Sequence, residues 1–411
     1  MNLISPRFIC GNRGDIASRY GILNTLQRGG AVVSAVFACR ASHLPQALQR
    51  SVLPYGPMYN IWPRRQGIQA LRRASAVIWT GGLDLQDDSS LLKLVHTLLV
   101  FASYRLLGLR ILVALQGAGP LTTPLGRWLA ARILRLTNLV LVRDRGSHDL
   151  LRNMLPDGRL RLASDGIFLP GFPERGDPFE LPSGTEALCA AEGRPVIGLN
   201  IRLWFHFANT VIPYRFRRGR FRKRAQARME VFLSAITTIV TELRRRKNAR
   251  IVLVSMYEPG VESWEDDAPL LQQIKDRFAE DSEVVLLTDD LPVLDLCALI
   301  ARFDLMIGTR LHSTLIALRG GVPAIHLAYT LKGHDIYADL GLSDWAFGID
   351  QATFTPQAVV ATAERILSDP QRFNHVRALV GPIVATNERA LQDALRCLNR
   401  RLPGTSQETD Q

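Results

Sequence analysis

The feature that most constrains this chain is a repeated alternation of short apolar runs with helical patterns. The run at 76–79 ends at Thr-Gly-Gly, the run at 111–115 ends at Gln-Gly-Ala-Gly-Pro, and the run at 139–142 ends at Arg-Asp. Continuous apolar runs of this length are typical of parallel strands that are buried on both faces and followed by polar loops. The first part of the chain is therefore predicted to form a parallel α/β sheet.

The alternation begins again after a segment rich in Pro, Gly and charged residues at about 169–195, which we interpret as an interdomain linker. The second set of predicted elements comprises strands at 196–201, 251–255 and 284–287 and helices at about 228–246 and 292–302. The 411 residues also exceed the length of one typical domain. We predict an α/β domain at 1–185, another at 190–385, and a terminal helix with a disordered tail at 386–411. Ligands of open parallel sheets bind beyond the carboxyl ends of the strands, so two facing sheets predict a joint site in a central cleft.

The positive charge of the chain is concentrated in one segment. The formal net charge is +12, and eight Lys or Arg residues lie within 215–228. The plainer interpretation is a solvated loop that leads into a helix. The functional interpretation is a docking patch for anionic lipid headgroups or for a diphosphate carrier, where each cation contributes on the order of 1 kcal/mol. Nucleic acid is not expected as a partner, because no base-reading motif with interleaved aromatic residues is present.

Cysteine spacing and hydropathy bear on where the chain works. The five cysteines are Cys10, Cys39, Cys189, Cys297 and Cys397. They are scattered, odd in number and without metal-ligand spacing, which favours a reducing, cytoplasmic setting. The N-terminus lacks the basic and apolar regions of a secretory signal. The most apolar stretch, 91–115, is interrupted by charged residues and is predicted as a buried helix and strand rather than a membrane span.

Two weaker candidate sites lie in the first domain. The sequence Gly-Asn-Arg-Gly-Asp at 11–15 follows an apolar run, and its glycines allow backbone N–H groups to approach an anion closely. The alternative is a tight turn with Asp15 as a helix N-cap. Arg143 and Asp144 are interpreted as an internal ion pair that fixes a loop, with a role in catalysis as the alternative. Asp165 follows another predicted strand. Its predicted role there is to accept a hydroxyl proton or to orient a base, and the alternative is that it caps a turn.

The strongest candidate lies at 307–333, where a strand, a charged loop, a helix and a second strand follow one another. Arg310 and His312 come directly after the first strand, so we expect them at the ligand-facing edge. An Arg fork suits carboxylate or phosphate, and His exchanges protons near neutral pH. Tyr329 and Lys332 end the second strand and are predicted at the same edge. The alternative for His312 is a loop histidine with ordinary hydrogen-bond partners.

These motifs, in their order along the chain, resemble those of the polysaccharide pyruvyl transferase family. The resemblance covers roughly residues 8 to 345 and is most specific where Arg-Leu-His is followed by Gly-Val-Pro and then Tyr-x-x-Lys. The matching motifs are GNRGD at 11–15, WTGGLDLQDD at 79–88, LQGAGPL at 115–121, VRDRGSHDLL at 142–151, SDGIF at 164–168 and the segment 303–333.

The resemblance implies a fold similar to the two-domain GT-B glycosyltransferases, with two Rossmann-like domains, the first on the acceptor side and the second on the donor side. It implies transfer of the pyruvyl group of phosphoenolpyruvate to two hydroxyls of one sugar in a cell-surface or exopolysaccharide or its lipid-linked precursor. The products are a pyruvate ketal and phosphate. Arg310 is expected to bind the donor, His312 to act as general acid or base, and Lys332 to contact the donor anion.

The expected chemistry fits these residue types. The methylene carbon of phosphoenolpyruvate must gain a proton, for which His312 is the predicted donor, assisted by Asp15 or Asp165. Besides Arg310 and Lys332, the predicted substrate-binding residues are Asn12, Gly14 and Tyr329. Phosphoenolpyruvate serves as donor substrate, and no cofactor or metal is expected.

The sequence also departs from the family pattern and leaves alternatives open. Ile16 stands where many members have Glu after the Gly-Asp turn, which concerns how the N-terminal loop holds the acceptor. One alternative is a GT-B glycosyltransferase that uses a nucleotide sugar, and another is a non-catalytic polysaccharide-assembly protein. A lipid-diphosphate-linked acceptor would explain the basic segment 215–228, so the protein is expected in the cytoplasm, with peripheral contact to anionic lipid at the inner face of the membrane.

Overall fold

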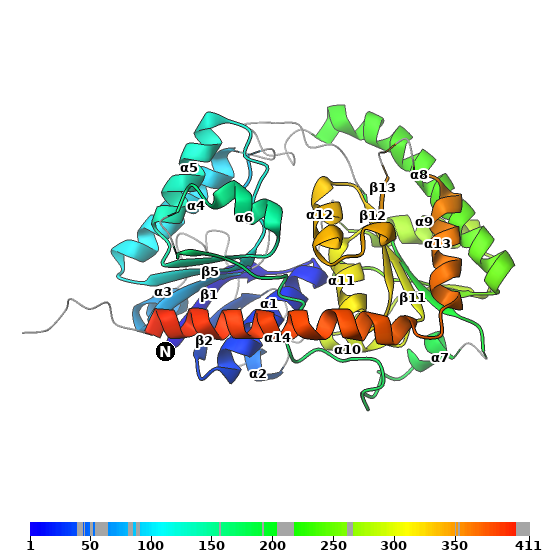
Figure 1. The fold of residues 1–411 in the computed structure, drawn as a ribbon, viewed down its shortest axis with the longest axis horizontal. Helices are drawn as coiled ribbons and strands as arrows, with labels where there is room; N and C mark the ends of the chain where they lie inside the picture. The colour runs from blue at the N-terminus through cyan, green and yellow to red at the C-terminus, as the bar shows by residue number, and fades with distance from the viewer. Residues whose placement is uncertain are drawn as a thin grey trace, which may run out of the picture.

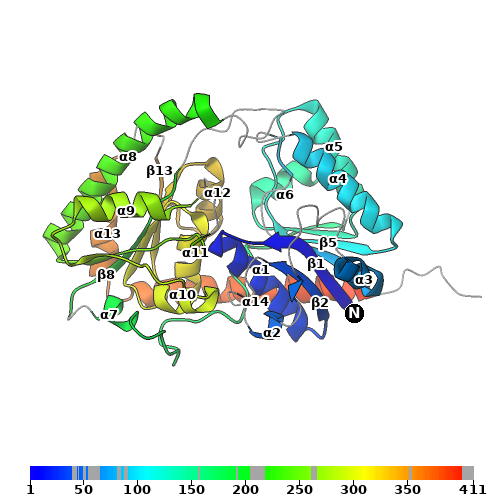
Figure 2. The same ribbon diagram turned by 180° about the vertical axis from the view of Figure 1, so that it is seen from behind.

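Two parallel sheets occupy the two halves of the molecule, which are coloured blue to teal and green to orange in Figure 1. The same division is seen from behind (Figure 2). The predicted fold of two Rossmann-like α/β domains is therefore confirmed. The computed structural model describes residues 1–38, 44, 46–49, 52–53, 65–80, 85–87, 91–155, 158–190, 193–203, 218–260, 266–349, 351 and 354–399.

The N-terminal sheet contains β1 (Asn2–Ile9), β2 (Val32–Ala38), β3 (Val52–Leu53), β4 (Ala76–Thr80), β5 (Arg110–Gln116), β6 (Leu139–Val142) and β7 (Leu160–Leu162). These described strands pair in parallel in the order β3-β2-β1-β4-β5-β6-β7. Every residue of β4 and β6 is buried, as the continuous apolar runs predict. The strand order reverses between β1 and β4, and α/β sheets bind ligands beside such a reversal.

Helices cover both faces of this sheet. They are α1 (Arg13–Arg28), α2 (Gln46–Gln49), α3 (Arg65–Arg73), α4 (Leu91–Leu106), α5 (Pro124–Arg135) and α6 (Arg145–Leu151). In Figure 1, α4, α5 and α6 lie above the sheet and α1 lies below it. The apolar stretch 91–115 forms α4 and β5, as predicted. Within the described part of the chain, no helix is both long enough and apolar enough to cross a membrane.

The C-terminal sheet contains β8 (Val196–Asn200), β9 (Arg250–Leu253), β10 (Val284–Leu286), β11 (Leu305–Gly308), β12 (Ala324–Ala328) and β13 (Ala346–Gly348). The strands pair in parallel in the order β10-β9-β8-β11-β12-β13. Here the order reverses between β8 and β11. The helices are α7 (Glu186–Cys189), α8 (Arg218–Lys247), α9 (Ala268–Arg277), α10 (Val293–Ile300), α11 (Leu311–Arg319), α12 (Leu331–Asp339), the 3₁₀ helix η3 (Ser343–Trp345) and α13 (Pro356–Ser368).

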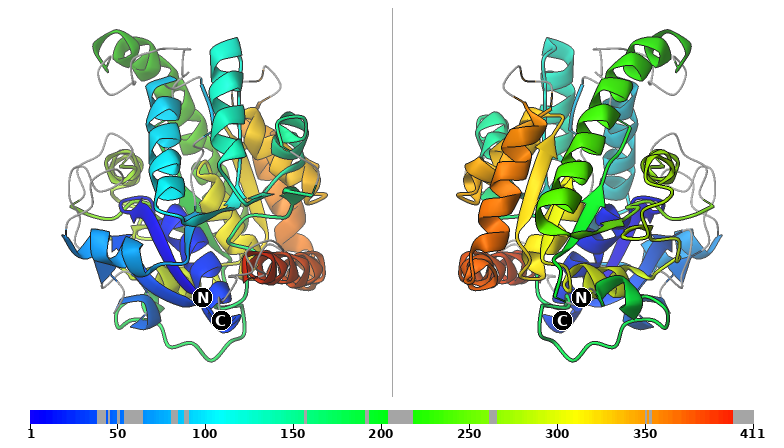
Figure 3. Two further views of the ribbon diagram at one scale, coloured as in Figure 1. Left: turned by 90° about the vertical axis from the view of Figure 1, so that its left-hand side faces the viewer. Right: turned by 90° about the vertical axis from the view of Figure 1, so that its right-hand side faces the viewer.

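The last helix, α14 (Arg372–Asn399), ties the two domains together. It runs horizontally across the lower half of the molecule in Figure 1 and is seen end-on in Figure 3. Near its end, Leu391 and Leu395 pack into the core of the N-terminal domain with Leu3 of β1. The helix is longer than the predicted 386–401, because it continues through Pro382, a residue that usually ends or kinks a helix.

Two sequence expectations meet the structure only in part. Residues 215–217 of the basic segment lie outside the described residues, α8 begins at Arg218, and the side chains of 218–227 are also not described. The predicted membrane contact through 215–228 therefore stays a prediction. Among the described cysteines, Cys189, Cys297 and Cys397 carry free thiols, whereas Cys10 is disulfide-bonded. The scattered cysteine spacing did not predict this bond.

Candidate active site

The two domains meet where the helices that follow their switch-point strands come together. Helix α1 follows β1, helix α11 follows β11, and the two helices lie next to each other in the middle of the molecule (Figure 2). Gly14 in α1 lies directly against the ring of His312 in α11. A Cβ on Gly14 would be only 2.2 Å from Cβ of His312, so this close approach requires glycine.

His312 lies between two carboxylates that both come from the N-terminal domain. Its Nδ1 is 3.7 Å from Oδ1 of Asp15 in the first turn of α1. Its Nε2 is 3.5 Å from Oδ2 of Asp165, which lies in the segment after β7. This distance is longer than that of an ordinary hydrogen bond. A doubly protonated ring would therefore face a carboxylate with each N–H group. The structure brings the three predicted catalytic residues together across the domain junction.

The pKa values of both carboxylates beside His312 are lower than usual. Burial works against ionisation of Asp165, but Arg143 and His312 outweigh it and hold the pKa of this carboxyl well below its usual range. Burial likewise opposes ionisation of Asp15, but His312 and Arg19 bring its pKa below the ordinary value. Asp165 is further fixed by Arg143, whose Nη1 donates to its Oδ2 at 2.6 Å, and by the backbone N–H of Ile167 at 3.0 Å.

The Gly-Asn-Arg-Gly-Asp sequence joins the domains. Asn12 is the N-cap of α1, because its Oδ1 accepts from the backbone N–H groups of Gly14 at 3.0 Å and Asp15 at 3.4 Å. The alternative prediction that Asp15 is the N-cap is wrong. Gly11, with φ of +77°, donates its N–H to Oε2 of Glu258 at 2.6 Å in the C-terminal domain. Substrate contact through Asn12 and Gly14 stays a prediction.

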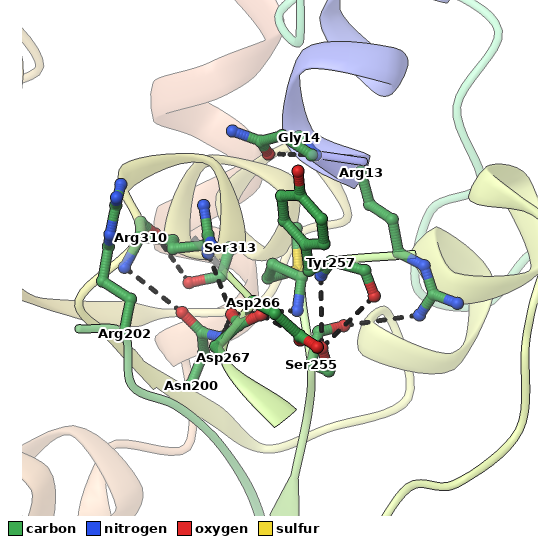
Figure 4. A network of polar contacts seen from close by, with 12 residues as sticks. Arg13, Gly14, Asn200, Arg202, Ser255, Tyr257, Asp266, Asp267, Arg310 and Ser313 are labelled. Atoms are coloured by element: carbon green, nitrogen blue, oxygen red, sulfur yellow. Dashed lines mark hydrogen bonds and ion pairs between the residues drawn. The ribbon is translucent and has the colours of Figure 1, made fainter. Parts of the chain in front are cut away.

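Arg310 lies in a fully buried polar network, which Figure 4 shows from close by. Its Nε donates to Oδ2 of Asp267 at 2.9 Å, and the side chains of Arg310 and Asp267 are 3% and 0% exposed. Asp267 also accepts from Nδ2 of Asn200 at 2.8 Å, from the backbone N–H of Met256 at 3.1 Å and, through Oδ1, from Oγ of Ser255 at 3.1 Å. Asp267 thus takes four hydrogen bonds and fixes the guanidinium plane of Arg310.

Sequence reasoning missed Asp267 and Asn200. Asn200 ends β8 and lies beside Gly308 of β11 in the sheet, so its place at a strand end was a usable signal. Asp267 stands before α9 in a segment with several acidic residues, and nothing in the local pattern distinguishes it from its neighbours.

Tyr329 has a partner of its own at this edge of the sheet. Its hydroxyl accepts from Nη1 of Arg202 at 2.9 Å, and the Arg202 guanidinium lies 5.2 Å from the centre of the Tyr329 ring. Arg202, in the segment after β8, was not predicted as a site residue. The contact places a second arginine beside the strand ends that carry Arg310 and Asn200 (Figure 4).

Lys332 reaches from α12 into the N-terminal domain. Its Nζ is 3.9 Å from Oδ2 of Asp144 and lies close to Gly117, the residue after β5. Burial, and then the nearby Arg143, lowers the pKa of Lys332 to about 7. The predicted internal pair of Arg143 with Asp144 is wrong, because Arg143 bonds to Asp165 while Asp144 caps α6 by accepting from the N–H of Ser147 at 2.7 Å.

Across the residues that the structure describes, no group of three or more His, Cys, Asp or Glu side chains is arranged to hold a metal ion.

Comparisons with known proteins identify a family that the chain matches. A family model described as "Polysaccharide pyruvyl transferase" matches residues 12–330, a range that begins at Asn12 and ends two residues before Lys332. The amylovoran biosynthesis protein AmsJ of Erwinia amylovora is 28% identical over 111 residues. That match covers 27% of this chain and spans only about a quarter, 26%, of AmsJ.

Solved structures that resemble the chain share its fold. The UDP-GlcNAc 2-epimerase of Neisseria meningitidis bound to UDP-GlcNAc superposes with a TM-score of 0.57 at 11% identity, covering 97% of this chain and 99% of that one. The S. aureus MnaA–UDP structure also reaches 0.57 at 11% identity, covering 98% and 100% of the two chains. At this identity the likeness concerns the GT-B fold alone.

Proposed function

The chain belongs to the polysaccharide pyruvyl transferase family, and we propose that it transfers the pyruvyl group of phosphoenolpyruvate to two hydroxyls of one sugar, forming a ketal and releasing phosphate. The observation that supports this most directly is the position of His312 between Asp15 and Asp165 at the domain junction. The similarity to a protein of amylovoran biosynthesis supports a polysaccharide, or its precursor, as acceptor.

The reaction needs one group that gives a proton and then takes one. In our proposal, His312 protonates the methylene carbon of phosphoenolpyruvate, which becomes the ketal methyl group while the first sugar hydroxyl adds to C2. The proton of that hydroxyl returns to His312. The second hydroxyl then adds to C2 as the C2–O bond to phosphate breaks, and its proton leaves with the phosphate. The balance is one donor and two hydroxyls consumed for one ketal and one phosphate.

The two carboxylates act on His312 rather than on the substrate in this scheme. The lowered pKa values of Asp15 and Asp165 make both groups weak bases at neutral pH. Their positions on either side of the ring suit them to orient it and to stabilise the imidazolium. Arg310, its plane fixed by Asp267, is proposed to bind the donor carboxylate as a planar fork.

The direct test measures phosphate release from phosphoenolpyruvate with a panel of free and lipid-linked glycans, together with mass analysis of the glycan product. We expect acceptor-dependent release in the wild type and a loss of about 10²–10⁴-fold in His312→Gln, the range for a general acid–base group. A matched control is His375→Gln, whose imidazole pairs with Asp369 at 3.0 Å on the exposed side of α14 and should leave the rate unchanged. If the protein bound a nucleotide sugar and not phosphoenolpyruvate, a glycosyltransferase would replace this proposal.

The acceptor is further proposed to be lipid-linked and presented at the cytoplasmic face of the membrane, because eight cations lie within 215–228. Vesicles with and without anionic lipid test this. Equal binding of the wild type and of a variant with the cations at 215–228 neutralised would contradict it.

A further inference from the structure

The N-terminal domain exposes large apolar side chains on the outer faces of α4 and α5. The left view of Figure 3 shows these two helices, coloured cyan and turquoise, side by side on the outside of the domain. Single apolar side chains on a surface are ordinary, whereas a group gathered on one face indicates an interaction site. The α4–α5 surface is defined here by the exposed residues Leu92, Val95, Leu99 and Leu106 of α4 and Leu125 and Trp128 of α5.

Helix α4 is apolar on two opposite faces. Leu94, Val100 and Phe101 pack into the core of the N-terminal domain. The exposed residues of α4 follow one another at steps of three, four and seven, which places them on one stripe of the helix, opposite the buried stripe. A surface helix of a globular domain ordinarily has charged and polar residues on that outer face. The predicted burial of 91–115 is thus met on only one face of α4, and its other face is free to contact an apolar partner.

Helix α5 carries an apolar section and then a basic section along its outer face. Leu125 and Trp128 lie in its first half, and the exposed residues Arg132 and Arg135 follow on the same stripe in its last turn. The guanidinium of Arg132 lies 5.2 Å from the centre of the Trp128 ring, and Trp128 is 51% exposed. An exposed Trp that is followed by Arg is typical of side chains at the boundary between lipid and water.

The two outer faces lie on the same side of the domain. Helix α4 connects β4 to β5 and α5 connects β5 to β6, so both helices run in the same direction between neighbouring parallel strands. Their buried faces share one core. Their first turns, with Leu92 and Leu125, therefore stand at the carboxyl ends of the strands, which is the edge of the sheet where the candidate active site lies.

The charges on these helices indicate the chemistry of the partner. The sequences 91–106 and 124–135 contain no Asp or Glu, and their cations are Lys93, Arg105, Arg127, Arg132 and Arg135. A second copy of the chain that docked through the same surface would form a two-fold dimer, which brings the same cations together and is therefore disfavoured. An anionic lipid bilayer offers both an apolar interior and negative headgroups, so it complements the surface in both respects.

We propose that the α4–α5 surface docks the N-terminal domain on an anionic lipid bilayer. Leu92, Leu99 and Trp128 enter the boundary between headgroups and acyl chains, and Arg132 and Arg135 contact the headgroups. This surface belongs to a different domain from the basic segment 215–228, and its contact is apolar as well as electrostatic. Docking needs neither donor nor catalysis, so the inference goes beyond the proposed transfer. For a lipid-linked acceptor, it would hold the protein at the membrane that carries the acceptor.

The test measures flotation of the full chain with vesicles of phosphatidylcholine alone or of an equal mixture with phosphatidylglycerol. The variants are the double changes Leu92→Gln with Leu99→Gln and Arg132→Gln with Arg135→Gln. Leu162→Gln is the matched control, because Leu162 is also exposed, by 44%, but lies on β7. We expect binding to the mixed vesicles to fall at least about tenfold in both double variants and to stay at the wild-type value in the control.

A second readout reports insertion itself. Brominated lipid quenches only tryptophan that reaches the acyl chains, so part of the tryptophan emission of the wild type should be quenched on mixed vesicles. That quenching should disappear in Trp128→Phe, whereas flotation should remain, because Phe keeps most of the apolar contact.

Three results would overturn the docking surface. They are no binding of the wild type to mixed vesicles, unchanged binding in both folded double variants, or a wild-type dimer that Leu92→Gln with Leu99→Gln separates into monomers. Thermal unfolding identifies a variant that has lost its fold, and the other double variant then decides. The two proposals fail separately. Vesicle binding without acceptor-dependent phosphate release would refute only pyruvyl transfer, and transfer to a free glycan without vesicle binding would refute only the docking surface.

Discussion

Two clusters of charged residues, one around Arg310 and one around Lys332, differ in whether their polar atoms have hydrogen-bond partners. The cluster around Arg310 is closed, because Asp267 accepts four hydrogen bonds and both side chains of the ion pair are buried. The cluster around Lys332 is open, because Lys332 Nζ and the atoms that approach it from Arg143 and Asp144 have no hydrogen-bond partner among the described residues. The first lies within one domain, and the second lies between the two.

This difference separates a guanidinium whose plane the protein fixes from an ammonium that has no hydrogen-bond partner among the described residues. A buried guanidinium with a fixed carboxylate partner has a set plane and position, and breaking the pair leaves an uncompensated charge. A buried ammonium without a partner keeps its donors for a molecule that enters later, at some expense of stability. The opposite effects of removing one charge from each cluster test this interpretation.

The largest effect is expected for Asp267→Asn. Loss of the carboxylate leaves Arg310 buried without its counter-charge, and the free energy of unfolding should fall by about 3–5 kcal/mol. Urea denaturation at pH 7 measures the change. Asp393→Asn is the control, because Asp393 pairs with Arg396 on the exposed surface of α14 and its loss should leave stability unchanged. Equal urea midpoints for the two variants would show that Asp267 does not stabilise the fold through Arg310.

Lys332→Met should act in the opposite direction. Removing a buried cation without a hydrogen-bond partner should raise the free energy of unfolding at pH 6 by about 1–3 kcal/mol. Below pH 7 Lys332 is charged in the folded protein, so its full destabilising effect is present. Between pH 7 and 10.5 Lys332 binds more protons in the unfolded chain than in the folded protein. The stability of the wild type therefore rises with pH in this range. The advantage of the variant over the wild type should therefore shrink as pH rises through this window. A variant less stable than the wild type at pH 6 would mean that the Lys332 ammonium has favourable partners in the folded protein.

Gly14→Ala should disturb the contact between the two domains. The new methyl group would overlap His312, and overpacking of this kind costs about 1–3 kcal/mol, with slower transfer because the ring moves. Gly146→Ala is the control, because a Cβ there would meet other atoms only at ordinary van der Waals distances of 3.6 and 3.7 Å and the position is helical. That control should not lower the free energy of unfolding. Thermal unfolding measures the loss of stability in Gly14→Ala against the control, and phosphate release measures the slower transfer.

The smallest expected effect is a pH dependence of anion binding. Sulfate does not titrate near neutral pH, so its affinity reports the charge on the protein, and a pKa of about 7 for Lys332 predicts about a tenfold weaker binding at pH 8 than at pH 6. The charged groups that act on Lys332 are Arg143, Asp144, Asp165 and Asp335. Lys332→Arg should remove the dependence, since Arg stays charged, whereas His312→Gln should keep it. A pH dependence that persisted in Lys332→Arg would show that Lys332 is not the group that titrates.

Much of the fold follows from the sequence. The apolar runs at 76–79, 111–115 and 139–142 became β4, β5 and β6, because a strand buried on both faces must be continuously apolar. The position of His312 directly after a buried strand predicted that it lies at the edge of the sheet beyond the strand ends, and the structure has it there, next to Gly14 of the other domain. Strand ends in a parallel sheet share one edge, so a local pattern was sufficient for that prediction.

The partners of the charged residues could not be predicted in this way. The sequence by itself determined two parallel sheets, their helices and the strand ends that carry Arg310, His312 and Lys332. Only the tertiary structure decided that Asp267 neutralises Arg310, that Arg143 bonds to Asp165 rather than to Asp144, and that Gly117 lies between two cations. Periodicity reports how one segment faces its own core, whereas these contacts join residues from separate strands and domains, whose meeting depends on how the two sheets pack together.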